Sequence, residues 1–361
     1  MNPIWQIFHE GGHMATLQVS EDIRDFENSP FGEKFCPWMV QSRFERGRWQ
    51  PFEVLAASDI ILSPAAKGLH YGSEIFEGLR AFRSSKGPVL YRPGMHARRM
   101  AHSARIVGME PLPEQQFIES LRALVLRCES LLPVFPGSLY LRPFMMGTTS
   151  RLGAGIADDL LFLALATPFG MKLDPARPKT AGAWVSRDFV RAVPGGMGSA
   201  KVAGNYASAL RAMLQAKAEG FENVLFLDAL ERRWIEELGG MNFFCVEDEV
   251  LRTPPLSETI LAGVTRDSLL ALAKVLGMRA EERPLAISDL LEGIQSGRVS
   301  EILACGTGSA VVALTRIGDT GITHQVADGN PGPFTVRLSE MLFDVQFGKA
   351  AALAPDWLIS C

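Results

Sequence analysis

The segment that most constrains the fold is residues 191–210, RAVPGGMGSAKVAGNYASAL. It holds a single lysine, Lys201, among glycines and alanines, directly before a run that predicts a helix. Small residues allow a bulky planar group to approach the backbone closely. A lysine held there and partly desolvated becomes a usable amine nucleophile. Most lysines are solvated surface charges, so this segment alone leaves both interpretations open.

Composition narrows the classes of protein to consider. The 361 residues, 47% apolar and 21% charged, suffice for two domains with separate cores. The net charge of −4 gives no general electrostatic reason to expect a nucleic-acid or membrane partner. The five scattered cysteines form no CxxC pair, which argues against a disulfide framework or a metal site. We therefore expect a small-molecule enzyme in the reducing cytoplasm, a cytoplasmic protein without a metal.

Hydrophobic periodicity and turn signals divide the chain into four parts. We expect an irregular, poorly packed arm over residues 1–30, a small domain over 31–168, a linker rich in proline over 169–182, and a large domain over 183–361. The clearest strands are predicted at 138–146 and 159–167, and the clearest helices at 95–107, 114–132, 206–219, 266–276, 287–295 and after Pro333. This mixed order favours an α+β fold over regular βαβ alternation.

Other segments supply chemistry that a lone lysine lacks. Glu237 precedes two glycines in IEELGGMN, and a carboxylate facing a pyridine nitrogen would keep the ring of pyridoxal 5′-phosphate (PLP) protonated and electron-withdrawing. Val264 and Thr265 begin a predicted helix after a glycine turn, and such a helix start can bind phosphate. Thr307 lies between two glycines that can form an anion-binding nest. Each signal is weak alone, because helix starts of this kind are common.

Taken together, these segments resemble the fold-type IV PLP-dependent aminotransferases, specifically the branched-chain amino acid aminotransferases. The matching stretches, in order, are FGEKF, LHYGSEIFEGLRAF, RPGMHARRM, SLYLRPF, KVAGNY, ELGGMNFF, TPPLSETILAGVTRDS and ACGTG. They are collinear over nearly the whole chain. The resemblance implies a two-domain enzyme with a smaller N-terminal α/β sandwich domain and a larger C-terminal pseudo-barrel domain.

The resemblance also implies cofactor-binding roles. Lys201 would form the internal aldimine with PLP and then carry a proton between the substrate α-carbon and the cofactor C4′. Glu237 would pair with the pyridinium nitrogen, and Tyr206 would hydrogen-bond the phenolic oxygen with Arg191 in support. The phosphate would be held by Arg99, Val264, Thr265 and Thr307.

The resemblance likewise implies a substrate pocket, formed by Phe31, Phe76, Tyr140 and Gly240. Arg142 would bind the distal carboxylate of glutamate or 2-oxoglutarate. Tyr71 and the loop around Leu152 would reach the neighbouring subunit's site, so a homodimer is expected. Each residue has a plainer interpretation as a half-buried aromatic, an ion-pair partner or part of the core.

Several positions depart from the family pattern. Gly308 stands where relatives commonly have Ala, Gly240 where mammalian members have Thr, and Ala154 where they have Val. Removing these methyl groups would widen the pocket, and one methylene changes discrimination by roughly 1–3 kcal/mol. We therefore expect bulkier or aromatic substrates to be accepted beside Leu, Ile and Val. Ser309 and Val312 replace the redox CxxC of mammalian members, so thiol regulation is not expected there.

Competing functions remain within and beyond the family. D-amino acid aminotransferase and aminodeoxychorismate lyase share the fold, but the long N-terminal part and YGSEIFEGLRAF favour the branched-chain group. A PLP-binding scaffold without turnover is a different class of function. The presence of Tyr71, Tyr140 and Arg142 argues against it, since a pure binder needs no second carboxylate site.

Overall fold

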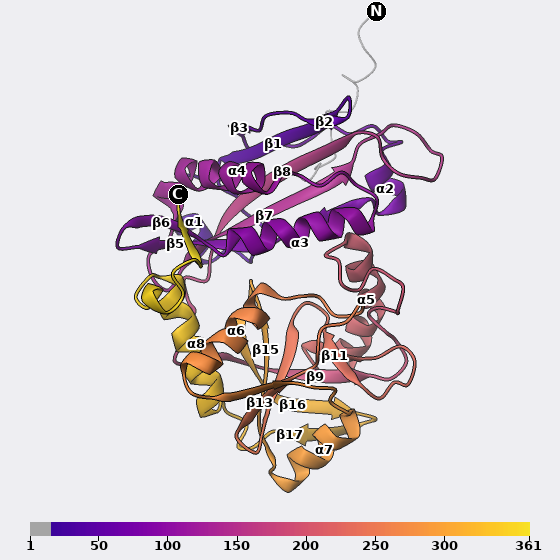
Figure 1. The fold of residues 1–361 in the computed structure, drawn as a ribbon, viewed down its shortest axis with the longest axis vertical. Coiled ribbons are helices and arrows are strands. Elements are labelled where there is room, and N and C mark those ends of the chain that lie inside the picture. Colours follow the sequence, from indigo (N-terminus) through magenta and orange to yellow (C-terminus); the bar gives the residue numbers. More distant parts are fainter. Residues whose placement is uncertain (1–15) are drawn as a thin grey trace, which may run out of the picture.

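The protein is described here by a computed structural model that covers residues 16–361. Two nine-stranded sheets, each with helices around it, lie one above the other in Figure 1. The first sheet is built mainly from the N-terminal half of the chain and the second from the C-terminal half. The predicted α+β class is confirmed.

The first sheet is antiparallel, with strand order β18-β6-β5-β7-β8-β1-β2; β3 pairs with β1 and β4 with β7. Its strands are β1 (Trp38–Glu45), β2 (Arg48–Trp49), β3 (Glu53–Ala56), β4 (Glu74–Phe76), β5 (Leu79–Ser84), β6 (Gly87–Tyr91), β7 (Ser138–Gly147), β8 (Leu160–Phe169) and β18 (Leu358–Ser360). Ser84 pairs with Gly87, so β5 and β6 form a hairpin with a turn at Ser85 and Lys86.

The helices of this half are α1 (Arg24–Glu27), α2 (Lys67–Tyr71), α3 (Pro93–Ile106), α4 (Glu114–Arg127) and the 3₁₀ turn η2 (Glu129–Leu131). The apolar residues of α4 recur at helical spacing, and Phe117, Leu121 and Leu124 are buried in the core between the helix and the sheet. The helix predicted over 114–132 ends earlier, at Arg127. Residues 1–15 of the predicted arm lie outside the described residues, whereas Phe26 of α1 packs into the core.

The second sheet closes into a barrel. Its order is β11-β10-β9-β16-β15-β12-β13-β14, with β17 beside β16, and β11 also pairs with β12 at Glu237 and Asn242. Its strands are β9 (Lys179–Ser186), β10 (Asn223–Leu227), β11 (Ile235–Leu238), β12 (Asn242–Glu247), β13 (Val250–Thr253), β14 (Arg279–Glu282), β15 (Val299–Gly306), β16 (Ala310–Asp319) and β17 (Ile322–Gln325). The β11–β12 pairing joins six of these strands into a ring.

The helices of this half are α5 (Ala203–Ala218), α6 (Val264–Val275), α7 (Ile287–Ser296), α8 (Pro333–Gln346) and the 3₁₀ turn η3 (Ala351–Leu353). Gly220 and Gly277 take the left-handed conformation that follows the ends of α5 and α6. β9 begins at Lys179, within the predicted linker, and β18 returns to the first sheet beside β6. The assignment of residues to two domains stays a prediction.

Two further observations concern residues 16–361 as a whole. None of their helices combines the length and apolar character that crossing a membrane requires. Within the same residues, no cluster of three or more His, Cys, Asp or Glu side chains is arranged to hold a metal ion.

Leu121 provides a test of the core on α4. It is fully buried, so Leu121→Ala should lower the free energy of unfolding by about 2–5 kcal/mol through lost burial and a cavity. The exposed Leu126 on the same helix is the control, and Leu126→Ala should change it by less than about 0.5 kcal/mol. Urea unfolding measures both; equal effects would contradict this packing.

Candidate active site

Lys201 lies where the two halves of the chain meet, directly before α5. Its carbonyl accepts a hydrogen bond from Phe76 N at 3.1 Å, and its N–H donates to Ser103 Oγ at 2.8 Å. Phe76 belongs to β4 and Ser103 to α3, so the first half of the chain fixes the lysine backbone. The side chain remains free to extend into the space between the halves.

A cavity of about 200 Å³ surrounds the Lys201 side chain. It brings together most of the predicted site residues: Phe76, Arg99, Tyr140, Arg142, Arg191, Lys201, Tyr206, Glu237, Gly240, Val264, Thr265, Thr307 and Gly308. Phe31 lies in an adjoining cavity of about 450 Å³ that shares Phe76, Tyr140 and Arg142 as walls. The side chains predicted to line one continuous site are therefore close in space.

Three predicted residues do not line either cavity: Tyr71, Leu152 and Ala154. The Tyr71 hydroxyl donates to the Leu152 carbonyl, which ties α2 to the loop that follows β7. Both side chains are exposed. Within a single chain these residues therefore lie outside the two cavities beside Lys201.

The Lys201 amine faces two aromatic rings. Its Nζ lies 2.6 Å from the Tyr206 hydroxyl, on the first turn of α5, and 4.8 Å from the centre of the Phe76 ring. The turn from Lys201 into the helix places the two polar groups side by side. A phenol and an amine are therefore held together on one side of the cavity.

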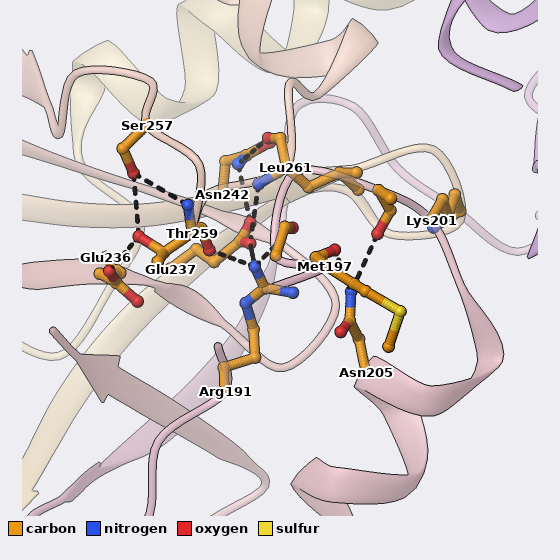
Figure 2. Close-up of polar contacts among 12 residues, drawn as sticks. Arg191, Met197, Lys201, Asn205, Glu236, Glu237, Asn242, Ser257, Thr259 and Leu261 are labelled. Carbon is orange, nitrogen blue, oxygen red and sulfur yellow. Dashed lines mark hydrogen bonds and ion pairs between the residues drawn. The ribbon is translucent and has the colours of Figure 1, made fainter. Parts of the chain in front are cut away.

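Glu237 is buried on the barrel-closing hairpin, with 3% of its surface exposed. Oε1 lies 2.8 Å from Arg191 Nη2 and accepts from Leu261 N at 3.0 Å, while Oε2 accepts from Asn242 Nδ2 at 3.0 Å. Figure 2 shows these contacts converging on the carboxylate. Burial raises the pKa of Glu237 to about 7, against the opposing charge of Arg191.

The opposite end of the cavity is suited to an anion. Val264 and Thr265 begin the 12-residue helix α6, whose first N–H groups carry no bonds within the helix. Gly263 precedes them, and a Cβ there would overlap the Asn242 amide oxygen, so only glycine allows this approach. Thr307 follows β15 in the neighbouring glycine turn. Backbone donors and a hydroxyl thus surround one end of the cavity.

Arg99 brings a positive charge to this end and is itself held by a buried carboxylate. Its Nε and Nη2 donate to the two oxygens of Glu77, each at 2.7 Å, and Nη1 donates to the Ala262 carbonyl at 3.0 Å. His96 Nδ1 also lies 2.7 Å from Glu77 Oε2. Burial alone would raise the pKa of Glu77, but Arg99 and His96 hold it well below its usual range.

Another side of the cavity is formed by β7 and the loop between β4 and β5. Arg142 Nη2 donates to the Tyr140 hydroxyl at 3.2 Å, and the guanidinium lies over the Phe76 ring. A Cβ on Gly78 would overlap that hydroxyl. Arg80, paired with Tyr140 in the β5–β7 ladder, is buried and donates to Ser138 Oγ at 2.6 Å. Two guanidinium groups therefore lie close to Tyr140.

Sequence reasoning did not single out Glu77, Gly78, Asn242 or Arg80. Glu77, Gly78 and Arg80 lie within EIFEGLRAF, where acidic and basic residues interrupt an otherwise apolar strand pattern. Such an interruption is the signal that could have found them. Asn242 carries no comparable signal, because its importance depends on the hairpin that places it opposite Glu237.

Comparison with known proteins identifies the family and the fold. Residues 74–317 match the family model described as Amino-transferase class IV. The fold and the site thus define a class IV aminotransferase.

The chain is 42% identical over 339 residues to a probable branched-chain-amino-acid aminotransferase of Streptomyces coelicolor, a match that covers 93% of both chains. It is 39% identical over 346 residues to the branched-chain-amino-acid aminotransferase of Mycolicibacterium smegmatis, again covering 93% of each. The chain belongs to the branched-chain amino acid aminotransferase family within class IV.

Solved structures show the same fold. A T.th. branched-chain amino acid aminotransferase complexed with N-(5′-phosphopyridoxyl)-L-glutamate matches with a TM-score of 0.74 and 25% identity, covering 90% of this chain and 99% of that one. The Escherichia coli enzyme matches with a TM-score of 0.72 and 28% identity, covering 89% and 98%. The expected fold-type IV architecture is confirmed.

The raised pKa of Glu237 predicts how the stability of the chain without bound ligand depends on pH. A carboxyl whose pKa is raised from 4.5 to about 7 by folding stabilises the fold below pH 4.5, and this contribution is lost as pH rises through 7. Glu237→Gln removes that titration. Between pH 4.5 and 8, the free energy of unfolding of the variant should rise by about 3 kcal/mol relative to that of wild type. Denaturant unfolding across this range measures the difference, and a pH-independent difference would contradict the prediction.

Proposed function

We propose that the protein transfers the amino group of a branched-chain or bulkier hydrophobic L-amino acid to 2-oxoglutarate, with PLP bound at Lys201. The observation that carries the proposal is the cavity in which the Lys201 amine, the Tyr206 hydroxyl and the buried Glu237 carboxylate face a common space. The similarity of the whole chain to branched-chain aminotransferases favours this activity over D-amino acid aminotransferase, aminodeoxychorismate lyase and a turnover-deficient scaffold.

The residues present fit PLP. An amine with an adjacent phenol, a buried carboxylate across the cavity, and free N–H groups at the start of α6 correspond to the aldehyde, ring nitrogen and phosphate. A Cβ on Gly240 or Gly308 would meet no atom within 4 Å, so the cavity remains open beside these groups. When bound, PLP supplies an electron sink that acidifies the α-proton of an attached amino acid.

The chain's own residues then have distinct roles. Lys201 Nζ would remove the proton from the substrate α-carbon and deliver it to the cofactor C4′, with the Tyr206 hydroxyl orienting the amine. Glu237 keeps a proton at the ring nitrogen, and its ion pair with Arg191 holds it in place. Val264, Thr265, Thr307 and Arg99 bind the phosphate.

Substrate recognition is assigned to the wall formed by Phe31, Phe76, Tyr140 and Arg142. The Arg142 Nε is buried and has no hydrogen-bond partner within residues 16–361, which suits it to a carboxylate of glutamate or 2-oxoglutarate. Apolar side chains would occupy the space between Phe31 and Phe76 in the adjoining cavity. One site would thereby accept both an apolar and an acidic side chain.

We also propose a homodimer and a cytoplasmic location. Exposed apolar side chains gather on α2, on the loop after β7 and on α5: Leu69, Tyr71, Leu152, Ile156, Leu210, Met213 and Leu214. Figure 1 shows α2 and α5 on the same side of the molecule. A large apolar surface of this kind favours burial against a second subunit, which would bring Tyr71, Leu152 and Ala154 to the partner's cavity. The five free cysteines suit a reducing compartment.

Lys201→Ala tests the assignment of the nucleophile. Purified wild-type protein with PLP should show a visible absorbance band that bleaches or shifts when an L-amino acid donor is added. The variant should lack this band and lose at least about 10³-fold in turnover, because no amine remains to move the proton. Lys86→Ala, in the exposed turn between β5 and β6, is the control. An unchanged spectrum in Lys201→Ala would refute the proposal.

Gly240→Thr tests the width of the pocket. The added side chain enters space that is open in wild type, so kcat/KM for Phe should fall about 10- to 100-fold relative to Val. Gly308→Ala should act in the same direction with a smaller effect. A donor panel measures the ratio, and wild-type turnover of Val equal to or better than Phe would count against a widened pocket.

A further inference from the structure

Glu236, the neighbour of Glu237 on β11, is a second buried carboxylate that the proposed chemistry does not use. Successive side chains of a strand point to opposite faces; Glu237 lines the cavity and Glu236 does not. Glu236 is nevertheless only 6% exposed, and its Oε2 has no hydrogen-bond partner within residues 16–361. A buried carboxylate costs free energy unless other groups compensate, so its presence calls for a reason.

The other oxygen of Glu236 holds a loop. The Thr259 hydroxyl donates to Glu236 Oε1, and the Ser257 hydroxyl lies 2.9 Å from Thr259 Oγ1. Because one hydroxyl donates one proton, Ser257 donates to Thr259 and Thr259 to Glu236. Figure 2 shows this chain of contacts from Ser257 through Thr259 to Glu236.

The same loop completes the environment of Glu237. The Thr259 carbonyl accepts from Arg191, which forms the ion pair with Glu237, and two residues later the Leu261 N–H donates to Glu237 at 3.0 Å. The Thr259 backbone also packs on the loop that leads to Lys201, since a Cβ on Gly198 would come within 2.5 Å of Thr259 Cα. Side chains from both faces of β11 thus hold the loop, Glu236 through Thr259 and Glu237 through Leu261.

We propose that Glu236 is a positioning residue that anchors residues 257–261 from behind β11 and thereby sets the geometry of Arg191 and Glu237 toward the cofactor ring. The inference rests on the proposed function of Glu237. Arg191 provides one positive charge for two adjacent carboxyls, and burial raises the pKa of Glu236 while nearby Asp228 raises it further. The Thr259 hydrogen bond and the Arg191 charge act in the opposite direction and lower the pKa of Glu236.

Four variants of the holoenzyme test the anchor. Glu236→Leu removes the acceptor and Thr259→Val removes the donor while keeping the carbonyl that binds Arg191. Each should weaken PLP binding about tenfold, measured by titrating PLP back after dialysis, and should shift the pH midpoint of its visible absorbance. The double variant should bind PLP no more weakly than either single variant, because both substitutions remove the same contact. Glu236→Gln, which keeps an acceptor oxygen without charge, should stay within about twofold of wild type.

Glu301→Leu is the matched control. Glu301 is a buried carboxylate of β15 that accepts from Phe334 N at 2.9 Å and Thr335 N at 2.8 Å, at the start of α8. Its loss should lower the melting temperature without changing PLP affinity. If Glu236→Leu and Thr259→Val behave like this control, Glu236 is only structural and the inference is overturned. If Glu236→Leu does not fold, Thr259→Val alone decides. Failure of wild type to bind PLP would instead overturn the proposed function.

Discussion

The ion pair between Arg191 and Glu237 is the interaction on which the site depends. A carboxylate with almost no exposed surface is tolerated only when donors surround it, and here the donors come from three separate segments: Arg191, Asn242 and Leu261. Asn242 is also the residue opposite Glu237 where β11 and β12 pair to close the barrel. The strand pairing that closes the barrel therefore also places a donor beside the buried carboxylate.

The lysine depends on the other half of the chain. Its backbone is held by β4 and α3, and Arg99 of α3 reaches across to the Ala262 carbonyl beside α6. Glu77 matters in this junction because a bidentate carboxylate fixes the planar guanidinium in one orientation. The cavity exists only where these contacts join the two sheets, which explains why its walls come from both.

The elements were largely predictable because hydrophobic periodicity and glycine stops are local signals, as at α5 and α6. The strand β9 begins earlier than expected because its pairing with β16 overrides the proline-rich composition before it. Among site residues, most of those within matching motifs line one cavity, whereas Phe31 lines the adjoining cavity and Tyr71 lines neither. Glu236 and Glu77 were not predicted, because their partners Thr259 and Arg99 lie 23 and 22 residues away in sequence. Asn242 was not predicted, because it meets Glu237 only through the pairing of β11 with β12.

The glycines around the cavity fall into two physical kinds, and the difference indicates where specificity can vary. A Cβ on Gly78, Gly198 or Gly263 would press on Tyr140, Thr259 or Asn242, so the packing of the site imposes glycine there. Gly240 and Gly308 line the same cavity, yet a Cβ on either would meet open space. Nothing in the fold requires their small size. Their effect falls on the volume left for a substrate, and a larger residue at either position can therefore narrow the pocket without disturbing the groups that surround Lys201.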